Sequence, residues 1–344
     1  MTIYNYRASD SFVIYAEDSA WGTAGSPLGS SYVDRVTSIN ATVENNPNIQ
    51  QGIGDGLNGV TITNGVVNVS GDINWEFTDP AFFQYLIIGS KVGTAGTVLL
   101  PYKIQETSQI GYETGETKSL TLGVESNNGS NDDGMLYDGV FFDSWTLNAT
   151  VGETIKCSAN WTARNVSSTT SIASYTGPTN RPFNFTSATA TFNSDTMGLL
   201  LSFSMTGTNT LNKKNQLGDR LLIQPVCQNR RYAFSGTIRL AKNTASSILD
   251  GLDMRGMVMG GTAASTTVTA TASANALGTL KLLFNEGTAS GSRVCTIQLE
   301  NAYFSNFSEP IDVGNGDIEI SFSGIALAGL TDSSNKTFCS YYTI

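Results

Sequence analysis

The stretch VVNVSGDINWEF, residues 66–77, decides the fold of this chain. Apolar residues alternate with polar ones along it, and the apolar face consists of Val67, Val69, Gly71, Ile73, Trp75 and Phe77. This alternation is typical of a β-strand with one buried face. A glycine in the middle of such a strand marks a bulge or a close approach of the backbone to another group. We therefore predict a half-buried strand with one of these features at its glycine.

A second stretch, YAFSGTIRLAK at residues 232–242, has the same alternation around the same Ser-Gly pair. Four further matches occur in the same order in the two parts of the chain. They are TSINATVENN (37–46) with TSATATFNSD (186–195), TDPAFFQYLIIG (78–89) with NTASSILDGLDM (243–254), LTLGV (120–124) with LKLLF (280–284), and the aromatic-rich segments 139–161 and 301–324. Chance readily gives one such match, but hardly five in one order. The sequence therefore predicts two copies of one domain.

The matched segments at 78–89 and 243–254 carry helix-start signals. In the first, Thr78 or Asp79 is the expected N-cap, Pro80 occupies the first helical position and Gly89 ends the helix. In the second, the expected N-cap is Asn243 or Thr244. Each domain is therefore predicted to contain one short helix.

The predicted fold class is all-β, with two tandem β-sandwich or barrel domains. High glycine content, few charged residues (14%) and abundant Ser, Thr and Asn favour β-structure. The predicted parts are an N-terminal arm (1–29), a first domain (30–170), a linker (171–180), a second domain (181–331) and a C-terminal tail (332–344).

Composition also limits the function. Histidine is absent, which removes the commonest general base and the usual metal ligand, so we expect neither catalysis nor a cofactor. The net charge of −10 argues against binding to a phosphate backbone. The amino terminus resembles no signal peptide, and no apolar run is long enough to span a membrane.

Other motifs have plain structural interpretations. The cysteines are expected to be small buried hydrophobic residues; they are Cys157, Cys227, Cys295 and Cys339. The loops NNGSNDDG (127–134) and DVGNGD (312–317) offer oxygen ligands for calcium, but they lack the full spacing of a calcium loop. Asp72 and Glu76 form an acidic pair on the polar face of a strand, where a solvated surface is the simpler interpretation.

The first copy resembles the tail tube proteins of tailed bacteriophages and related viruses. The segments that carry the resemblance are YAEDSAWGTAGSP (15–27), TSINATVENN (37–46), NNPNIQQGIGDGLNG (45–59), VSGDINWEF (69–77), AFFQYLIIG (81–89) and DGVFFDSWTLNATVGETIKCSANW (138–161). The second copy keeps the order but has no arm, a longer loop at 193–230, and Ala-Ser in place of Pro-Ala at its helix start.

The resemblance implies a structural virion protein of the viral tail that forms stacked rings and conducts DNA into the host. Six domain positions close a ring in such families, so two domains per chain imply a trimer that imitates a hexamer, with a hexamer as the alternative. The implied partners are further copies of the chain, the tape-measure protein and the terminator protein. Double-stranded DNA would pass through without specific binding, and the residues that line the lumen stay unassigned.

The arm and the long loop are expected to bridge to neighbouring subunits or rings. Aromatic residues in a segment outside both domains indicate docking onto a neighbour. The contact candidates are Tyr15, Trp21, Pro47, Ile49, Ile53, Leu57, Phe82 and Tyr85.

Three alternatives remain open at this point. A cell-surface adhesin or surface-layer protein of tandem Ig-like domains would explain the composition and the repeat, but it predicts a secretion signal. A capsid decoration or fibre protein is the nearest competitor among virion proteins. An enzyme on a jelly-roll scaffold is disfavoured by the lack of histidine.

Overall fold

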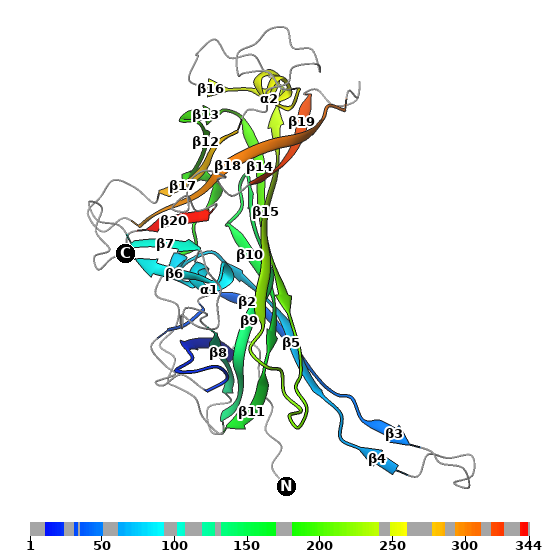
Figure 1. The fold of residues 1–344 in the computed structure, drawn as a ribbon. Coiled ribbons are helices and arrows are strands. Elements are labelled where there is room, and N and C mark those ends of the chain that lie inside the picture. The colour runs from blue at the N-terminus through cyan, green and yellow to red at the C-terminus, as the bar shows by residue number, and fades with distance from the viewer. Residues whose placement is uncertain are drawn as a thin grey trace.

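The computed structural model of the chain describes residues 11–23, 31–33, 35–50, 61–92, 102–106, 119–127, 132–169, 181–240, 248–259, 277–285, 293–310, 318–326 and 338–342. In these residues the protein is an all-β structure with two short α-helices (Figure 1). We call residues 11–169 the first half and residues 181–342 the second half. The all-β fold class predicted from the sequence is therefore confirmed.

The described part of the first half contains eleven strands, one 3₁₀-helix and one α-helix. They are β1 (Ser11–Glu17), β2 (Val36–Asn45), β3 (Asn48–Gln50), β4 (Thr61–Thr63), β5 (Val67–Glu76), the 3₁₀-helix η2 (Pro80–Phe82) running into α1 (Phe83–Leu86), β6 (Gly89–Val92), β7 (Tyr102–Glu106), β8 (Leu120–Asn127), β9 (Asp132–Thr150), β10 (Lys156–Ala163) and β11 (Asn165–Thr169).

The second half begins with a 3₁₀-helix and continues as strands around one helix. Its elements are η3 (Phe185–Ser187), β12 (Ala188–Phe192), β13 (Asp195–Met197), β14 (Leu200–Asn212), β15 (Val226–Arg239), β16 (Ile248–Leu249), α2 (Gly251–Val258), β17 (Gly278–Asn285), β18 (Val294–Ser308), β19 (Glu319–Ala326) and β20 (Phe338–Tyr342).

Strand pairing follows one order in both halves. The first half pairs as β1–β8–β9–β10–β5–β2, and the second as β12–β17–β18–β19–β15–β14, all antiparallel. β9 also pairs with β14, which joins the halves. The result is a central sheet in the order β2–β5–β10–β9–β14–β15–β19–β18, whose long strands run along the length of the molecule (Figure 1).

The central sheet has one apolar face, which packs into the core. Val69, Ile73, Trp75 and Phe77 are at most 3% exposed, as the alternation in residues 66–77 predicts. The corresponding positions of residues 232–238 are buried as well. A single hydrophobic cluster contains side chains from both halves.

Two mid-strand glycines are needed because an aromatic ring covers them. Gly71 is paired with Trp161, and Gly236 with Phe322. A Cβ at Gly71 would lie 2.4 Å from the Trp161 ring, and one at Gly236 would lie 2.6 Å from both the Phe322 ring and the carbonyl oxygen of Ser202. Of the two features expected at these glycines, the structure shows the close approach.

The two halves share aromatic contacts at their junction. The Phe77 ring lies 5.3 Å from Phe183 and 5.8 Å from Phe284, measured between ring centroids. The backbone amide of Phe183 donates to the carbonyl of Phe77 at 2.9 Å, and the amide of Ile155 donates to the carbonyl of Phe183 at the same distance. The predicted domain boundaries therefore run through a continuous core.

The structure corrects the expectation that residues 1–29 form an arm outside the domains. Residues 11–17 form β1, which pairs with β8 along its whole length. Side chains of β1 from Phe12 to Tyr15 are buried. This part of the segment belongs to the sheet of the first half.

The likeness between residues 37–46 and 186–195 does not mark equivalent strands. β2 pairs with β5, whereas β12 pairs with β17. In the second half, β14 takes the place of β2, because it pairs with β15 in the way that β2 pairs with β5. β14 lies within residues 193–230, which the sequence analysis assigned to a long loop. Alternation alone cannot distinguish two strands of the same composition.

The helix-start signals are partly right. Asp79 caps the first helix, accepting a hydrogen bond from the Ala81 amide at 2.8 Å, with Pro80 following it. That helix ends at Leu86 instead of Gly89. The second helix begins at Gly251, where Asp250 and Asp253 form a capping box, so the N-cap predicted at residues 243–244 is wrong.

Candidate assembly interface

β2 forms one side edge of the central sheet. Within the described ranges it pairs with β5 alone. Its residue Val43 lies on the same face as the buried Val69, with which it is paired, yet Val43 is 48% exposed. An apolar side chain on an unpaired strand edge invites pairing with another strand.

On β14, the position that corresponds to Val43 is covered by a neighbouring strand. Val43 is paired with the residue two positions before Gly71, and Met205 of β14 is paired with the residue two positions before Gly236, so Val43 corresponds to Met205. Met205 is 0% exposed because β9 lies alongside it, paired from Thr150↔Ser202 to Ser144↔Thr208. The difference between these two positions follows from the presence or absence of a neighbouring strand.

β18 forms the opposite side edge. β17 pairs with β18 only as far as Ala302, and β19 pairs with it from Ala302 to Ser308. Among the residues that the structure places, nothing pairs with the other side of segment 303–308. In the first half, β9 occupies the place of β18, and the same side of β9 pairs with β14.

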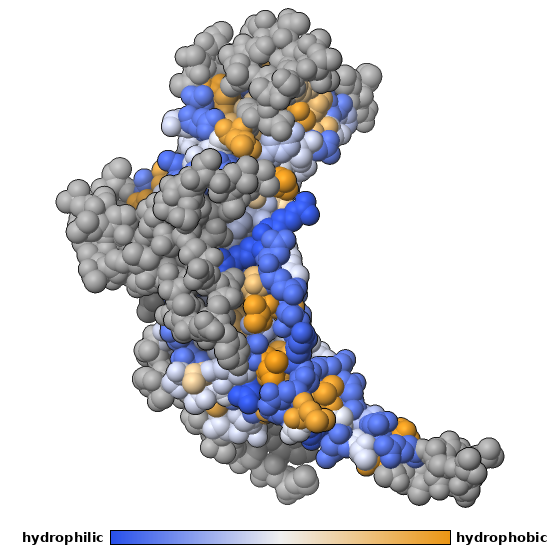
Figure 2. All heavy atoms as spheres, viewed as in Figure 1, coloured by the Kyte–Doolittle hydropathy of each residue, from blue (hydrophilic) through white to orange (hydrophobic). Residues whose placement is uncertain are grey.

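The β3–β4 hairpin projects from the body of the molecule (Figure 1). Ile49 and Ile62 are paired across it and are 63% and 69% exposed, and Figure 2 shows apolar residues on this projection among hydrophilic ones. Arg220 of the β14–β15 connection braces its base: Nε donates to the Gly65 carbonyl at 2.8 Å, and Nη2 donates to Asn45 Oδ1 at 2.7 Å. The hairpin is therefore held in position from the second half.

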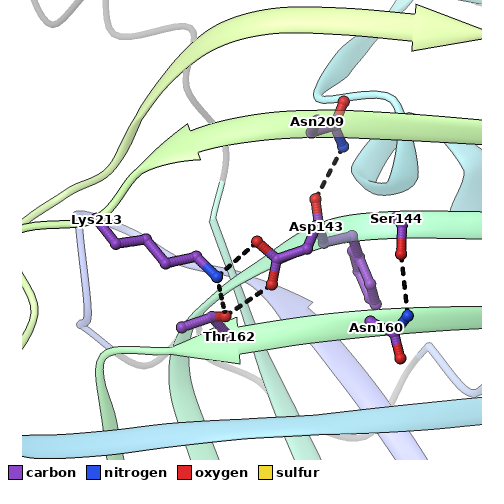
Figure 3. A network of polar contacts seen from close by, with 7 residues as sticks. Asp143, Ser144, Asn160, Thr162, Asn209 and Lys213 are labelled. Atoms are coloured by element: carbon purple, nitrogen blue, oxygen red, sulfur yellow. Dashed lines mark hydrogen bonds and ion pairs between the residues drawn. The ribbon is translucent and has the colours of Figure 1, made fainter.

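The face of the central sheet opposite the core is polar. Figure 3 shows part of it, where Lys213 Nζ lies 2.6 Å from Asp143 Oδ1 and donates to Thr162 Oγ1 at 2.7 Å. Nearby, the Asn160 amide donates to Ser144 Oγ at 3.0 Å. Asn209 in the same view lies on the core side, donating to the carbonyls of Leu86 and Phe142, and so ties the end of α1 to β9.

Two carboxyl groups lie next to β8, the half-buried Asp18 and the buried Asp138. Asp18 accepts hydrogen bonds from Ser119 and Thr121 at 2.6 Å and from the Gly139 amide at 3.1 Å. Burial raises the pKa of Asp18, and burial together with the nearby Asp18 raises the pKa of Asp138. These bonds anchor the segment after β1 to β8 and β9, which is a structural role.

Three predicted contact residues lie in the core of the chain itself. Tyr15, Phe82 and Tyr85 are buried and contact one another, with ring centroids 5.0 to 6.1 Å apart. Tyr15 lies on the core strand β1, and its predicted contact with a neighbouring subunit stays a prediction. Trp21 is half-buried and stacks on Phe141 of its own chain at 5.4 Å.

The other contact candidates come from the long loop. Pro47 directly precedes the projecting hairpin and Ile49 lies in its strand β3, and both are exposed. Ile53 and Leu57 lie outside the described residues. Sequence reasoning missed the exposed edge of β2, because an edge depends on which strands are neighbours.

The cysteines that the structure describes in full support the structural interpretation. Cys157, Cys227 and Cys295 are buried, and burial raises the pKa of the Cys157 thiol. In the described ranges, no group of three or more Asp, Glu or Cys side chains could hold a metal ion. The calcium loops of the sequence lie mostly in residues outside those ranges.

The described helices are all too short to cross a membrane. The fold places the chain among all-β proteins with exposed sheet edges. A family model for phage tail tube proteins matches residues 8–326, so the chain belongs to that family. It is therefore a structural component of a phage tail tube and of the virion tail, and the adhesin, decoration-protein and enzyme alternatives are not favoured.

Solved structures also resemble the chain. One is the tail tube of SPP1, determined by solid-state NMR and cryo-electron microscopy, with 13% identity and a TM-score of 0.30 over 49% of this chain and 81% of that chain. A search of curated proteins finds no match.

Proposed function

We propose that three copies of this chain close into a ring with pseudo-sixfold symmetry and that the rings stack into the tail tube. In this proposal the two halves are copies of one domain. The observation that carries it is the pair Val43 and Met205, which occupy corresponding positions but are 48% and 0% exposed.

Ring closure follows from repeating a contact that already exists in the chain. β9 of the first half pairs with β14 of the second. The same contact between β18 of one chain and β2 of the next would cover Val43 as β9 covers Met205. Head-to-tail contacts of this kind form a closed ring when the rotation permits it. Closure would also remove both sheet edges, which are a liability in a lone chain.

Stacking is assigned to the projecting hairpin. Pro47 and Ile49, together with Ile53 and Leu57 of the same loop, would contact the next ring. The tape-measure protein inside the tube and a terminator protein at its end are the other proposed partners, and duplex DNA passes through without specific binding. No catalytic step is assigned to the chain.

The mass of an isolated ring tests the proposal. Three chains of 36.6 kDa and six chains differ twofold, so native mass spectrometry distinguishes them directly. We expect the mass of three chains and, in negative-stain images, rings with sixfold-like outlines that stack into tubes. A six-chain ring would contradict the trimer, and a stable monomer at high concentration would contradict the ring itself.

A further inference from the structure

We infer that β11 is a second contact site between subunits. One side of this strand pairs with β9 of its own chain, and the other side takes a strand from the second half of the neighbouring copy. This inference rests on the proposed ring. It adds to the contact between β18 and β2 another one that lies outside the central sheet.

β11 and β20 occupy corresponding places in the two halves. β11 follows β10 along the chain and pairs with the first part of β9. β20 follows β19 and pairs with the first part of β18. Because β9 with β10 and β18 with β19 are equivalent pairs in the strand order, the two short strands have equivalent neighbours.

The register of the strands agrees with this correspondence. β9 and β18 each have a bulge directly after a buried phenylalanine, Phe142 in the first half and Phe304 in the second. Five residues before each phenylalanine, the long strand is paired with an apolar residue of β11 or of β20. These pairs are Val166↔Tyr137 and Phe338↔Leu299. The two short strands therefore match in register as well as in order.

The second side of β20 is paired, whereas that of β11 is open among the described strands. β20 also pairs with β7, from Cys339↔Gln105 to Tyr342↔Tyr102, and Figure 1 shows the two strands side by side. Within the described ranges β11 pairs with β9 alone, and its residues Ser167 and Ser168 are exposed. An open strand edge offers its backbone groups to a further strand.

The contact between β7 and β20 identifies the partner of β11. It joins the first half to the second within one chain, as the contact between β9 and β14 does. The proposed ring repeats the β9–β14 contact between chains as β18 with β2. The same rotation repeats the β7–β20 contact, with β11 of the next chain in the place of β20. The copy that contributes β18 therefore also contributes the strand that pairs with β11.

The segment of that copy which takes the place of β7 is residues 260–276. β7 comes between α1 and β8 in the first half, and residues 260–276 come between α2 and β17 in the second. They lie outside the described residues. Their stretch TVTATA, residues 267–272, alternates Thr with Val or Ala, which favours a β-strand. Adding a strand to an open edge relies on backbone hydrogen bonds, so such small side chains suffice.

Hydrogen exchange measured by mass spectrometry tests the inference on the assembled ring. The test variant replaces residues 266–272 with a Gly-Ser sequence of equal length. The control variant replaces residues 109–115, in the connection between β7 and β8, in the same way. We expect the amides of β11 to exchange at least about tenfold more slowly in wild-type rings than in monomers obtained by dilution.

The test variant should lose this protection of β11 while β2 stays protected, and the control should keep both. Equal exchange of β11 in rings and monomers would overturn the inference and leave the proposed ring intact. Protection of β11 that persists in the test variant would overturn it as well, because another segment would then cover the strand.

If the replacement prevents assembly, a cryo-electron microscopy map of the wild-type tube decides. Residues 266–272 of a neighbouring copy must lie beside β11 in that map, and any other occupant of this edge contradicts the inference. A wild-type chain that forms no ring and leaves β2 unprotected would instead contradict the proposed function.

Discussion

Gly236 allows a close contact that any side chain would block. The Phe322 ring and the Ser202 carbonyl both approach the position of a Cβ to 2.6 Å. A ring can rotate aside, but a backbone carbonyl in the middle of a sheet cannot move without disturbing its ladder. Gly71 has the same relation to Trp161 and to the carbonyl of Asn40.

Gly236→Ala should therefore destabilise the folded chain. Overpacking of this kind costs about 1–3 kcal/mol, which urea denaturation followed by circular dichroism would measure as a lower midpoint. Ser235→Ala, at the neighbouring residue on the polar face, serves as the control and should change stability little. An unchanged midpoint for Gly236→Ala would show that the strands separate more easily than the packing implies.

The buried Asp138 makes a second prediction at this scale. Its pKa lies above the ordinary value of 3.8 because of burial and the nearby Asp18. The native state therefore binds more protons than the unfolded state above pH 3.8, and this group's contribution to stability decreases as the pH rises through the raised pKa. Asp138→Asn should flatten the change of melting temperature with pH in that interval.

Asp133→Asn, an exposed neighbour on β9, is the control for this measurement and should leave the pH profile as it is in the wild type. If Asp138→Asn reproduces the wild-type profile as well, the pKa of Asp138 does not differ between the folded and unfolded states, and the effects of Thr121 and Arg164 offset burial.

At the scale of elements, the exposed edge of β2 governs assembly. Val43→Lys should leave the fold of the monomer intact because the side chain is 48% exposed there. It should abolish ring formation, since the charge would be buried beside β18 of the next chain. Analytical ultracentrifugation would show monomers where the wild type forms rings.

Glu44→Lys provides a matched control for Val43→Lys, because Glu44 is exposed on the same strand but points to the opposite face. It should assemble normally. Rings formed by Val43→Lys would mean that β2 is not at the subunit contact.

A substitution in the projecting hairpin should impair the stacking of rings without impairing the formation of single rings. Ile49→Asp should prevent rings from stacking while leaving single rings intact, because the hairpin lies apart from the central sheet. Electron microscopy would count tubes against rings, with Leu277→Asp, another exposed apolar residue, as the control. Tubes of normal length from Ile49→Asp would exclude a role for Ile49 in stacking.

Sequence patterns predicted single elements better than their neighbours. The alternation in residues 66–77 identified β5 and its buried face, and Asp79 with Pro80 marked the first helix. The exposure of Val43 was not predictable, because alternation gives the face of a residue and not the strand that lies beside it. The same limit explains why Tyr15 was assigned to an arm outside the domains but lies on a buried strand of the sheet.

At the scale of the whole molecule, the halves behave as one unit because Phe77 joins them. Phe77→Ala should cost about 3–5 kcal/mol, since the ring is fully buried between Phe183 and Phe284. Differential scanning calorimetry should show one transition at a lower temperature for the variant. Val151→Ala, at an exposed turn, is the control. Two separate transitions in the wild type would show that each half unfolds independently.

β20 has a consequence for the order of events during translation. This strand lies between β7 of the first half and β18 of the second, paired with both. The ribosome makes β7 long before β20, so the β6–β7 hairpin must wait with one open side while the second half emerges. Long-range pairing of this kind is slow. A nascent chain therefore completes its first half only after its second, which delays polymerisation until synthesis has passed β20.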